Sequence, residues 1–482
     1  MFETSFLLMI KSSLINILLP LIPGIIFLRI FYGKKIQGIL LYIMGWFVGV
    51  GVIAFSIFNL QFIHYGIGIK EYLFILLLLV IIFITKIILK KISLKDYINT
   101  LKISSNRQEL NDSYNGLPRI EKKFFILSAI FASIFLITTF VYRISFPTYG
   151  DDSFGNWNGP AFNIYQDGGV KLFGDKTEIL GRGRLGYPIY IPVYKALISD
   201  FTGGFNDIYI NMWQFLVFLG LILFVAKITR DKTKNVFYSI LPIVGVMGLP
   251  LVFFHANEGY MELACAAYSI LTIWSFWKFL EGKDYGYMSL ALLLGFILSN
   301  IKNDGLLGYF AGIVIGFLII IILKKEFNEI LKGFIKEKRY LLFNLFYLIF
   351  FLLPFIIIKK YYNLGFNQSV SSEGGLGISS NIHTEVFNQF KPIFINMDNY
   401  NVVLIIVFII GFLLYKVPKD NYNKKFLYIT PMIILLIFIL VFLLTENYIF
   451  AMNQTTINRV FTMAFVILLS FSGFLLYSEG KD

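Results

Sequence analysis

The chain is poor in cysteine, histidine and charge, and each shortage excludes a class of protein. Its single cysteine, Cys265, permits no intrachain disulfide and no paired-cysteine metal site. The three histidines, His64, His255 and His383, are too far apart for a metalloprotease-type zinc motif. Charged residues make up 15% of the 482 residues, whereas soluble proteins have about 25%. A soluble globular fold, a disulfide scaffold and a motif-bound zinc centre are therefore excluded.

Apolar sequence, by contrast, is abundant. Apolar residues account for 57% of the chain, and its mean hydropathy is +0.74. Repeated apolar stretches of about 20 residues are long enough to cross a bilayer as helices, which satisfy their own backbone hydrogen bonds in lipid. A transmembrane β-barrel would instead show short alternating strands. The sequence predicts an all-α polytopic membrane protein with about 13 transmembrane helices. We place these at residues 12–32, 37–59, 71–90, 124–145, 207–228, 236–254, 259–280, 285–301, 305–323, 341–359, 401–416, 426–444 and 457–477.

Lys and Arg residues are shared unevenly between the two sides of this bundle. About 29 of the 42 fall in alternate connections that begin with Lys34 and Lys35. Because basic connections stay on the cytoplasmic side, residues 146–206 and 360–400 are expected on the extracytoplasmic face of the cytoplasmic (inner) membrane. The net charge of +13 then reflects topology, and no nucleic-acid partner is expected.

Two units are predicted along the chain. Residues 1–123 form an N-terminal three-helix membrane segment and a cytoplasmic linker. Residues 124–482 form a larger transmembrane module that carries both outer loops. We expect the functional site in this second unit.

The outer loop 146–206 begins with paired acids, Asp151 and Asp152, just beyond a span. Charge at a membrane boundary is costly, so acids held there usually have a function. Asn156 and Trp157 follow, and carboxylates and amides with aromatic rings suit a carbohydrate ligand. The alternative is a solvated surface loop with incidental charges, although long ordered loops are usually functional.

The second half of the same loop carries two arginines, Arg182 and Arg184, followed by Tyr187 and Pro188. Arginine binds phosphate with two parallel hydrogen bonds, so these residues are candidate phosphate ligands. Residues 193–201 are amphipathic in pattern, and we predict that they lie flat at the membrane interface.

A second candidate segment, HANEGYMEL, spans the end of one apolar stretch and the start of the next. Its Glu258 and Glu262 are four residues apart, which on one helix places both on the same face. A buried carboxylate at that depth needs a partner, so a helix-packing role is the alternative to a catalytic one. His255 stands at the same boundary, and an incidental histidine is the simpler reading there.

Two further cations fall at outer boundaries. Lys302 and Asp304 interrupt a long apolar run, and Arg459 stands at the outer start of the last predicted span. Both cations are candidate phosphate ligands; the alternatives are a snorkelling anchor for Lys302 and an internal ion pair for Arg459. Acids and cations from four distant segments are thus expected at one membrane face.

The order of these motifs resembles that of the GT-C glycosyltransferases, the polytopic superfamily that uses polyprenyl-phosphate-linked sugars. The resemblance runs from about residue 120 onward and is distantly similar to the protein O-mannosyltransferase and aminoarabinose transferase families. It depends on GDDSFGNWNGPA at 150–161, YP at 187–188, GYMEL at 259–263, NIKNDGLL at 300–307 and TINR at 456–459. The chain departs from the family pattern where Asp151 replaces a tryptophan, Pro160 a lysine, Glu262 an aspartate and Asp304 a glutamate.

The resemblance implies an inverting sugar transfer from a polyprenyl-phosphate carrier to an acceptor hydroxyl on a cell-envelope glycan, lipid or protein. Its implied catalytic residues are Asp152 as general base, with Asp151, Glu258 and Glu262. Its implied donor-phosphate ligands are Lys302, Arg459, Arg182 and Arg184. Its implied acceptor or sugar contacts are Trp157, Asn156, Tyr187 and His255.

The residues do not decide whether the protein uses a metal cofactor or which functional class it belongs to. If a divalent metal ion is used, Asp152 and Glu258 are its expected ligands, because carboxylates suit hard cations. The expected partners are the lipid-linked sugar, membrane lipid and the acceptor. The competing classes are a lipid-linked polysaccharide polymerase or ligase, a lipid-sugar flippase or transporter, and a non-catalytic membrane scaffold.

Overall fold

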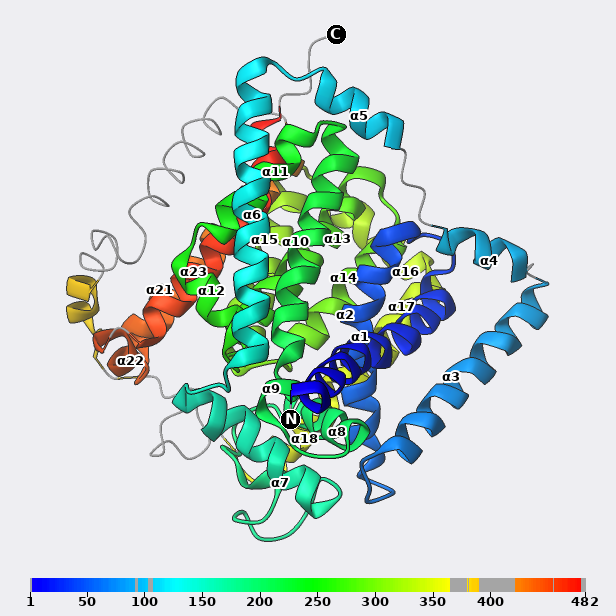
Figure 1. Ribbon diagram of the computed structural model, residues 1–482, viewed down its shortest axis with the longest axis vertical. Helices are drawn as coiled ribbons and strands as arrows, with labels where there is room; N and C mark the ends of the chain where they lie inside the picture. Colours follow the sequence, from blue (N-terminus) through cyan, green and yellow to red (C-terminus); the bar gives the residue numbers. More distant parts are fainter. Residues whose placement is uncertain are drawn as a thin grey trace.

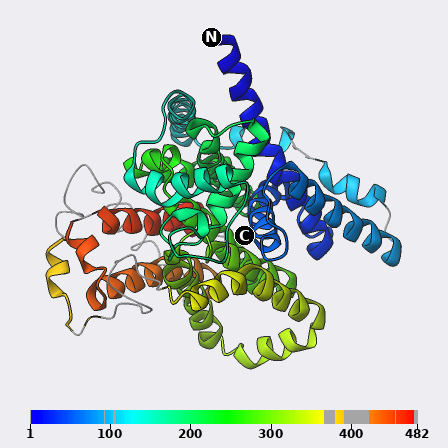
Figure 2. The same ribbon diagram turned by 90° about the horizontal axis from the view of Figure 1, so that it is seen from below.

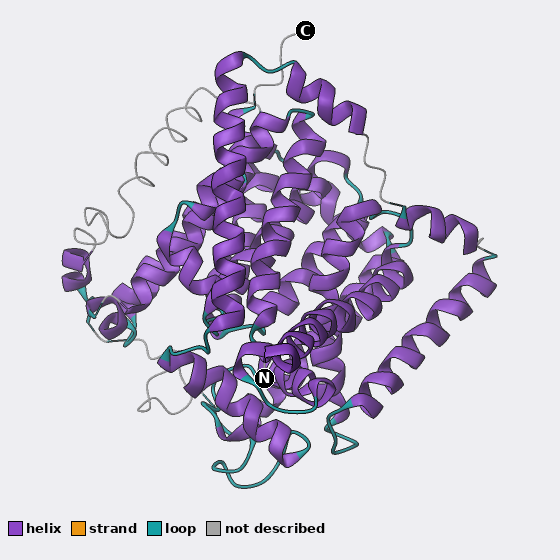
Figure 3. Ribbon diagram, in the orientation of Figure 1, coloured by secondary structure: helices purple, strands orange, loops and turns teal. Residues whose placement is uncertain are grey.

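The computed structural model describes residues 2–91, 94–102, 107–364, 379, 381–389, 421–453 and 455–477. Within these residues the chain is built of helices and loops and contains no β-strand (Figure 3). The predicted all-α class is therefore confirmed for the described part of the chain. Most of the predicted outer loop 360–400 lies outside it.

The elements follow one another as consecutive helices. Those of the first half are α1 (Phe2–Tyr32), α2 (Gly38–Leu60), α3 (Ile69–Lys90), α4 (Leu94–Leu101), α5 (Arg107–Asn115), α6 (Arg119–Ser145), η1 (Ser153–Asn158), α7 (Gly159–Asp167), η2 (Leu180–Arg182), α8 (Tyr190–Thr202), α9 (Asp207–Ile210) and α10 (Met212–Thr233). Those of the second half are α11 (Val236–Met247), α12 (Pro250–Asn257), α13 (Glu262–Gly282), α14 (Tyr285–Leu298), η3 (Gly305–Phe310), α15 (Ala311–Leu323), α16 (Phe327–Lys336), α17 (Lys338–Tyr347), η4 (Leu348–Leu352), α18 (Leu353–Tyr361), η5 (Thr384–Val386), α21 (Tyr422–Leu444), α22 (Tyr448–Met452), α23 (Thr455–Ser470) and α24 (Ser472–Leu476).

Nine helices of the described chain are long and apolar enough to cross a bilayer, which indicates a multi-pass membrane protein. They are Leu7–Tyr32, Gly38–Leu60, Ile69–Lys90, Arg119–Ser145, Asp207–Thr233, Glu262–Gly282, Gly305–Leu323, Lys338–Tyr361 and Tyr422–Leu444. Together α11 and α12 also qualify, but they are bent by 76° at their break. The helices Tyr285–Leu298 and Thr456–Ser470 are apolar but shorter. The predicted span 401–416 lies outside the described residues, so the count of about 13 remains a prediction.

Helix α13 forms the centre of the bundle, where it packs against α10, α14 and α23 (Figure 1). Of its most apolar stretch, 94% is buried, compared with 17% for α3 and for α6. Their apolar side chains therefore face outward, where a membrane protein meets lipid. Figure 2 views the bundle from the end at which α7 lies and shows the first turns of α1 projecting beyond it.

The loop between α6 and α10 gathers at one end of the bundle as α7, η2, α8 and α9, and α5 lies at the opposite end (Figure 1). The expectation that residues 193–201 lie flat on the membrane surface was wrong. All residues from Tyr190 to Ser199 are buried, and α8 packs against α1, α2 and α7. Its polar side chains face partners inside the protein, so the amphipathic pattern does not mark a lipid surface here.

Candidate active site at one end of the bundle

Glu258 anchors the chain segment that leads into Asp152. Its Oε2 accepts hydrogen bonds of 3.2 Å from the backbone N–H groups of Tyr149 and Gly150, and one of 3.5 Å from the Ser153 hydroxyl. Burial raises the pKa of the Glu258 carboxyl, and the two backbone donors offset this only in part. Glu258 thus fixes the backbone just before Asp151 and Asp152.

The expected common helical face of Glu258 and Glu262 was wrong. Glu258 lies beyond the end of α12 in an extended conformation (φ −90°, ψ 162°), whereas Glu262 begins α13. Four-residue spacing brings side chains together only in a continuous helix, and the chain turns at Gly259 and Tyr260 between them. The two carboxylates therefore have different neighbours.

Five charged side chains from four segments form a continuous chain of alternating sign, here called the outer charge network: Asp152, Arg459, Glu262, Lys302 and Asp304. The Nη1 of Arg459 lies 2.6 Å from Asp152 Oδ2 and 3.4 Å from Glu262 Oε1. Lys302 Nζ lies 2.9 Å from that same Glu262 oxygen and 2.9 Å from Asp304 Oδ2. The structure thus brings together four residues predicted for the site, and with them Asp304, which the sequence named only as the neighbour of Lys302.

The outer charge network has a partly exposed rim, formed by Asp152 and Asp304, and a buried floor, formed by Glu262 and Lys302. The side chains of Asp152 and Asp304 are 30% and 28% exposed, while those of Glu262 and Lys302 are 3% and 6% exposed. Burial lowers the pKa of the Lys302 ammonium, but the carboxylates of Asp304 and Glu262 outweigh it and raise the pKa well above its usual value. Lys302 is therefore a permanent cation, and a ligand from outside meets the rim acids first.

Both rim acids stand directly before a π-helical turn. Asp152 precedes η1 and Asp304 precedes η3. Such turns are rare and occur often at functional sites because they redirect side chains. Within η1, Asn156 donates a hydrogen bond of 3.0 Å to Asp152 Oδ1. At the start of η3 the chain lies so close to the end of α14 that a Cβ on Gly305 would lie 2.1 Å from the Leu298 carbonyl oxygen, so only glycine fits there.

Aromatic rings cover the cationic side of the outer charge network. The Arg459 guanidinium carbon lies 4.9 Å from the centre of the Tyr260 ring, within the range of a cation–π interaction. The His255 ring lies 5.6 Å from the same tyrosine ring. His255 is completely buried, and neither of its ring nitrogens has a hydrogen-bond partner in the described structure. It lines the inner wall of the site and does not reach the rim.

Two of the expected sugar contacts are buried packing residues. Trp157 is 2% exposed, and its ring meets that of Tyr187 edge to face at 5.5 Å. Burial raises the pKa of the Tyr187 phenol, and the nearby Lys302 ammonium counteracts this in part. An indole so enclosed offers no free ring face to a ligand in this structure.

Three of the expected site residues lie apart from the outer charge network. Arg182 is at the surface and forms hydrogen bonds of 2.6 Å with both carboxylate oxygens of Asp167. Arg184 is exposed, and its charge acts on Tyr187. Asp151 is also exposed and forms no hydrogen bond or ion pair with any described residue. These three remain available to a ligand that approaches from outside.

Sequence reasoning missed several buried cations at this end of the bundle, and Lys359 is the one that bonds to the turn carrying Lys302. Lys359 is 4% exposed and donates a hydrogen bond of 2.8 Å to Asn303, whose own amide donates to the Gly186 carbonyl at 3.0 Å. A lysine at the end of an apolar stretch usually marks a membrane boundary, so no sequence signal distinguished it. It links α18 to the turn that carries Lys302 and Asp304.

A buried polar network holds the loop from behind. Asp207 accepts hydrogen bonds from the Thr148 hydroxyl at 2.9 Å and from the Asn158 amide at 2.5 Å. Lys195 Nζ donates to Asn158 and to Asn211, both at 2.7 Å. Burial lowers the pKa of Lys195 to about 7. The partners are spread over residues 148–211 and include α8 and α9, so the network fixes how that loop folds.

Both expected metal ligands have protein partners in this structure. Glu258 Oε2 is occupied by backbone donors, and Asp152 is bonded to Arg459 and Asn156. The described residues contain no cluster of three or more His, Cys, Asp or Glu side chains that would hold a metal ion. Comparison of the whole chain with protein-family models, with curated proteins and with solved structures finds no match.

Proposed function

We propose that this protein is an inverting glycosyltransferase that moves a sugar from a polyprenyl-phosphate carrier to an acceptor hydroxyl at the extracytoplasmic face. The observation that carries this proposal is the outer charge network itself. Its acids and cations come from four of the five segments on which the GT-C resemblance depends, and Tyr187 of the fifth segment packs beside it. A sugar-phosphate donor needs cations, and an acceptor hydroxyl needs a carboxylate.

Asp152 is the best-placed general base. Its side chain is 30% exposed, so an acceptor hydroxyl can reach it, and Arg459 and Asn156 hold its two oxygens in place. In the proposed step the acceptor oxygen attacks the anomeric carbon and its proton passes to Asp152. The bond between the anomeric carbon and the phosphate oxygen breaks, and its electron pair stays on the phosphate. One displacement inverts the anomeric configuration.

Arg459 and Lys302 are the proposed partners of the leaving phosphate. Both cations are already fixed by Glu262, so little reorganisation is required when negative charge develops on the phosphate. Glu262 bonds to both cations and carries the same sign of charge as the phosphate, so we assign it as a positioning residue. Asp151, exposed beside the base, is the proposed contact for the acceptor.

The test is to follow the sugar–phosphate bond. Proteoliposomes containing the full-length protein are supplied with a mixed pool of radiolabelled polyprenyl-phosphate sugars and membrane extract as acceptor, and label lost from the carrier is measured. Protein-free liposomes are the control. Transfer of label to an acceptor with inverted anomeric configuration is expected. Label that crosses the bilayer on an intact carrier would identify a flippase and contradict the proposal, and a product of retained configuration would contradict the single displacement.

A further inference from the structure

Helix α16 joins two candidate spans at the end of the bundle opposite the outer charge network. The span Gly305–Leu323 begins next to Asp304 and leads away from it, and the span Lys338–Tyr361 follows α16. The ten residues of α16, Phe327–Lys336, lie between the two spans and contact both α15 and α17 (Figure 1). A short segment between two spans of one bundle lies where the hydrocarbon core of a bilayer ends and its headgroups begin.

Contacts with the start of α14 fix which face of α16 turns toward the bundle. The Tyr285 hydroxyl donates a hydrogen bond of 3.2 Å to the Ile330 carbonyl oxygen. Ile330 is 5% exposed, and a side chain at Gly333 would collide with Tyr285. Just before α16, Glu326 pairs with Lys283. These contacts fix the rotation of α16 about its axis.

The adjoining face of α16 is apolar and uncovered. Phe327, Leu331 and Ile335, here called the apolar stripe, follow at four-residue intervals and so line one side of the helix. They are 43%, 46% and 56% exposed. The nearby ends of the two spans are also apolar and exposed, at Ile322 and Leu342. Figure 2 shows this segment, in yellow-green, at the margin of the bundle. The apolar stripe therefore continues the lipid-facing surface of α15 and α17.

A polar stripe runs beside the apolar one. Asn328, Lys332 and Lys336, here called the polar stripe, repeat at the same interval one residue further along. Over residues 324–339 the chain carries six basic and three acidic residues. Around its axis, α16 thus presents the bundle, an apolar face and a basic polar face in turn. This order is typical of a helix that lies in the plane of a membrane surface.

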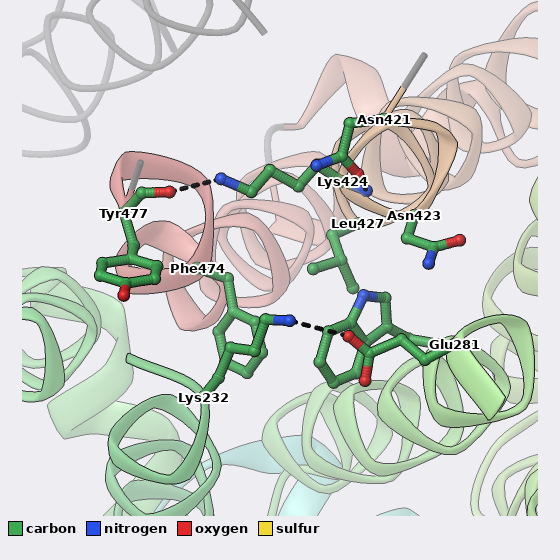
Figure 4. A pocket seen from close by; sticks show the side chains of 9 residues that line it. Lys232, Glu281, Asn421, Asn423, Lys424, Leu427, Phe474 and Tyr477 are labelled. Atoms are coloured by element: carbon green, nitrogen blue, oxygen red, sulfur yellow. Dashed lines mark hydrogen bonds and ion pairs between the residues drawn. The ribbon is translucent and has the colours of Figure 1, made fainter. Parts of the chain in front are cut away.

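The lysines of the polar stripe differ from other cations at the same end of the bundle. Figure 4 shows a cavity of about 170 Å³ in which Lys232 lies 3.0 Å from Glu281 and Lys424 donates a hydrogen bond to the Tyr477 carbonyl oxygen. Those two cations have partners within the protein. Lys332 and Lys336 are exposed and form no ion pair with any described residue. Their charges are therefore open to the headgroups of lipids.

We infer that α16 is an in-plane membrane anchor that binds the anionic phospholipids of the adjacent leaflet. The apolar stripe enters the acyl-chain region, and the lysines of the polar stripe reach the phosphate groups. Such a helix is held by the apolar area that it buries in the membrane and by the attraction of its lysines to anionic lipid. The distribution of Lys and Arg predicts that this end is cytoplasmic, where anionic lipids make the surface negative. No residue of α16 belongs to the outer charge network, so the inference does not depend on the proposed sugar transfer.

The first test measures what surrounds α16 in nanodiscs that contain the full-length protein. An environment-sensitive thiol fluorophore is attached at Leu331→Cys, or at Asn328→Cys as the matched position on the polar stripe. Cys265 is buried, so wild type treated with the same fluorophore is the blank. The expected result is that a phospholipid with a nitroxide in its acyl chain quenches the probe at 331 and that aqueous iodide quenches the probe at 328. Strong iodide quenching at 331 would place the apolar stripe in water, and protection from both quenchers would show that protein covers it. Either result would overturn the inference.

The second test asks whether the lipid beside α16 is anionic. The nitroxide is carried on phosphatidylglycerol or on phosphatidylcholine, and quenching of the probe at Leu331→Cys is compared. Quenching by phosphatidylglycerol should be roughly fivefold more efficient at low ionic strength. The preference should disappear in Lys332→Gln with Lys336→Gln. It should remain in the control Lys122→Gln with Lys123→Gln at the start of α6, a helix that packs against α10, α11 and α12. Equal quenching by the two lipids in the chain without lysine substitutions, or an equal loss in the control, would contradict the proposed binding of anionic lipid.

Discussion

Arg459 and Asp152, 307 residues apart in the chain, are joined by a hydrogen bond of 2.6 Å. The arginine stands at the start of the last described long helix and the aspartate follows the fourth predicted span, so this pair closes the bundle at one end. The Nη1 atom that binds Asp152 also lies 3.4 Å from Glu262. A substitution of one member of the outer charge network therefore changes the electrostatic environment of the next member.

Replacement of Glu262 is predicted to be the most destabilising change in this network. Glu262→Gln removes the buried negative charge between Lys302 and Arg459, and breaking a buried ion pair by removing one partner costs about 3–5 kcal/mol. Asp304→Asn should cost about 1 kcal/mol or less, because its side chain is 28% exposed. Chemical unfolding of both variants in the same detergent tests this. Equal losses would show that Glu262 is not the central counter-ion.

Tyr260 is predicted to act through the face of its ring. Tyr260→Phe keeps that face beneath the Arg459 guanidinium and should retain nearly wild-type transfer. Tyr260→Leu loses a cation–π contact of about 0.5–2 kcal/mol and should slow transfer by roughly tenfold. Initial rates of label release measure the difference. If Tyr260→Phe is as impaired as Tyr260→Leu, the hydroxyl and not the ring is required.

Glycine is predicted to be obligatory at the start of η3 but not within η1. Gly305→Ala would force a methyl group to 2.1 Å from the Leu298 carbonyl oxygen and should lower the yield of folded protein. Gly155→Ala has open space around the new methyl group and should be neutral or stabilise by up to about 1 kcal/mol. Size-exclusion profiles and unfolding curves compare the two. A monodisperse, stable Gly305→Ala protein would contradict the close approach.

The buried Lys195 predicts a specific dependence of stability on pH. Burial lowers its pKa in the folded protein from 10.5 to about 7. Between these values the unfolded chain binds more protons than the folded one, so the free energy of unfolding should rise as the pH rises from about 7 toward 10. Below pH 7 both states are protonated and the contribution no longer changes.

Lys195→Met tests this contribution. It removes the hydrogen bonds to Asn158 and Asn211 and so lowers stability at every pH, but it should also flatten the rise above pH 7. Unfolding midpoints measured across pH 6–9 show the slope directly. A variant with the wild-type slope would show that another group titrates in this range.

The sequence predicted the members of the outer charge network better than their surroundings. Asp152, Glu262, Lys302 and Arg459 stand out because charge is expensive at a membrane boundary, and that cost is visible in a single chain. Lys359 also lies at a membrane boundary, but a lysine at the end of a transmembrane helix is commonly an interface anchor, so it did not stand out. The sequence shows where a charge would be costly to bury, but it does not show which side chain pairs with that charge.

The errors have a common physical cause, because a sequence does not show which faces of an element become covered. Trp157 is an aromatic residue in a polar loop, which suggested a contact with a sugar, yet the ring of Tyr187 packs against it. Residues 193–201 have an amphipathic pattern, yet α1, α2 and α7 enclose them. The spacing of Glu258 and Glu262 implied one helical face only if no turn intervened. In each case tertiary packing decided the outcome.

The most direct measurement compares Asp152→Asn with Asp151→Asn in the label-release assay, with unfolding midpoints recorded for both. The two residues are adjacent, but only Asp152 is bonded to Arg459 and Asn156. A positioned general base contributes about 100-fold or more, so Asp152→Asn should lose at least that factor while remaining folded. Asp151→Asn should lose much less, because Asp151 is proposed only to contact the acceptor and not to take its proton. Equal release by the wild type and both folded variants would contradict the assignment of Asp152 as the base.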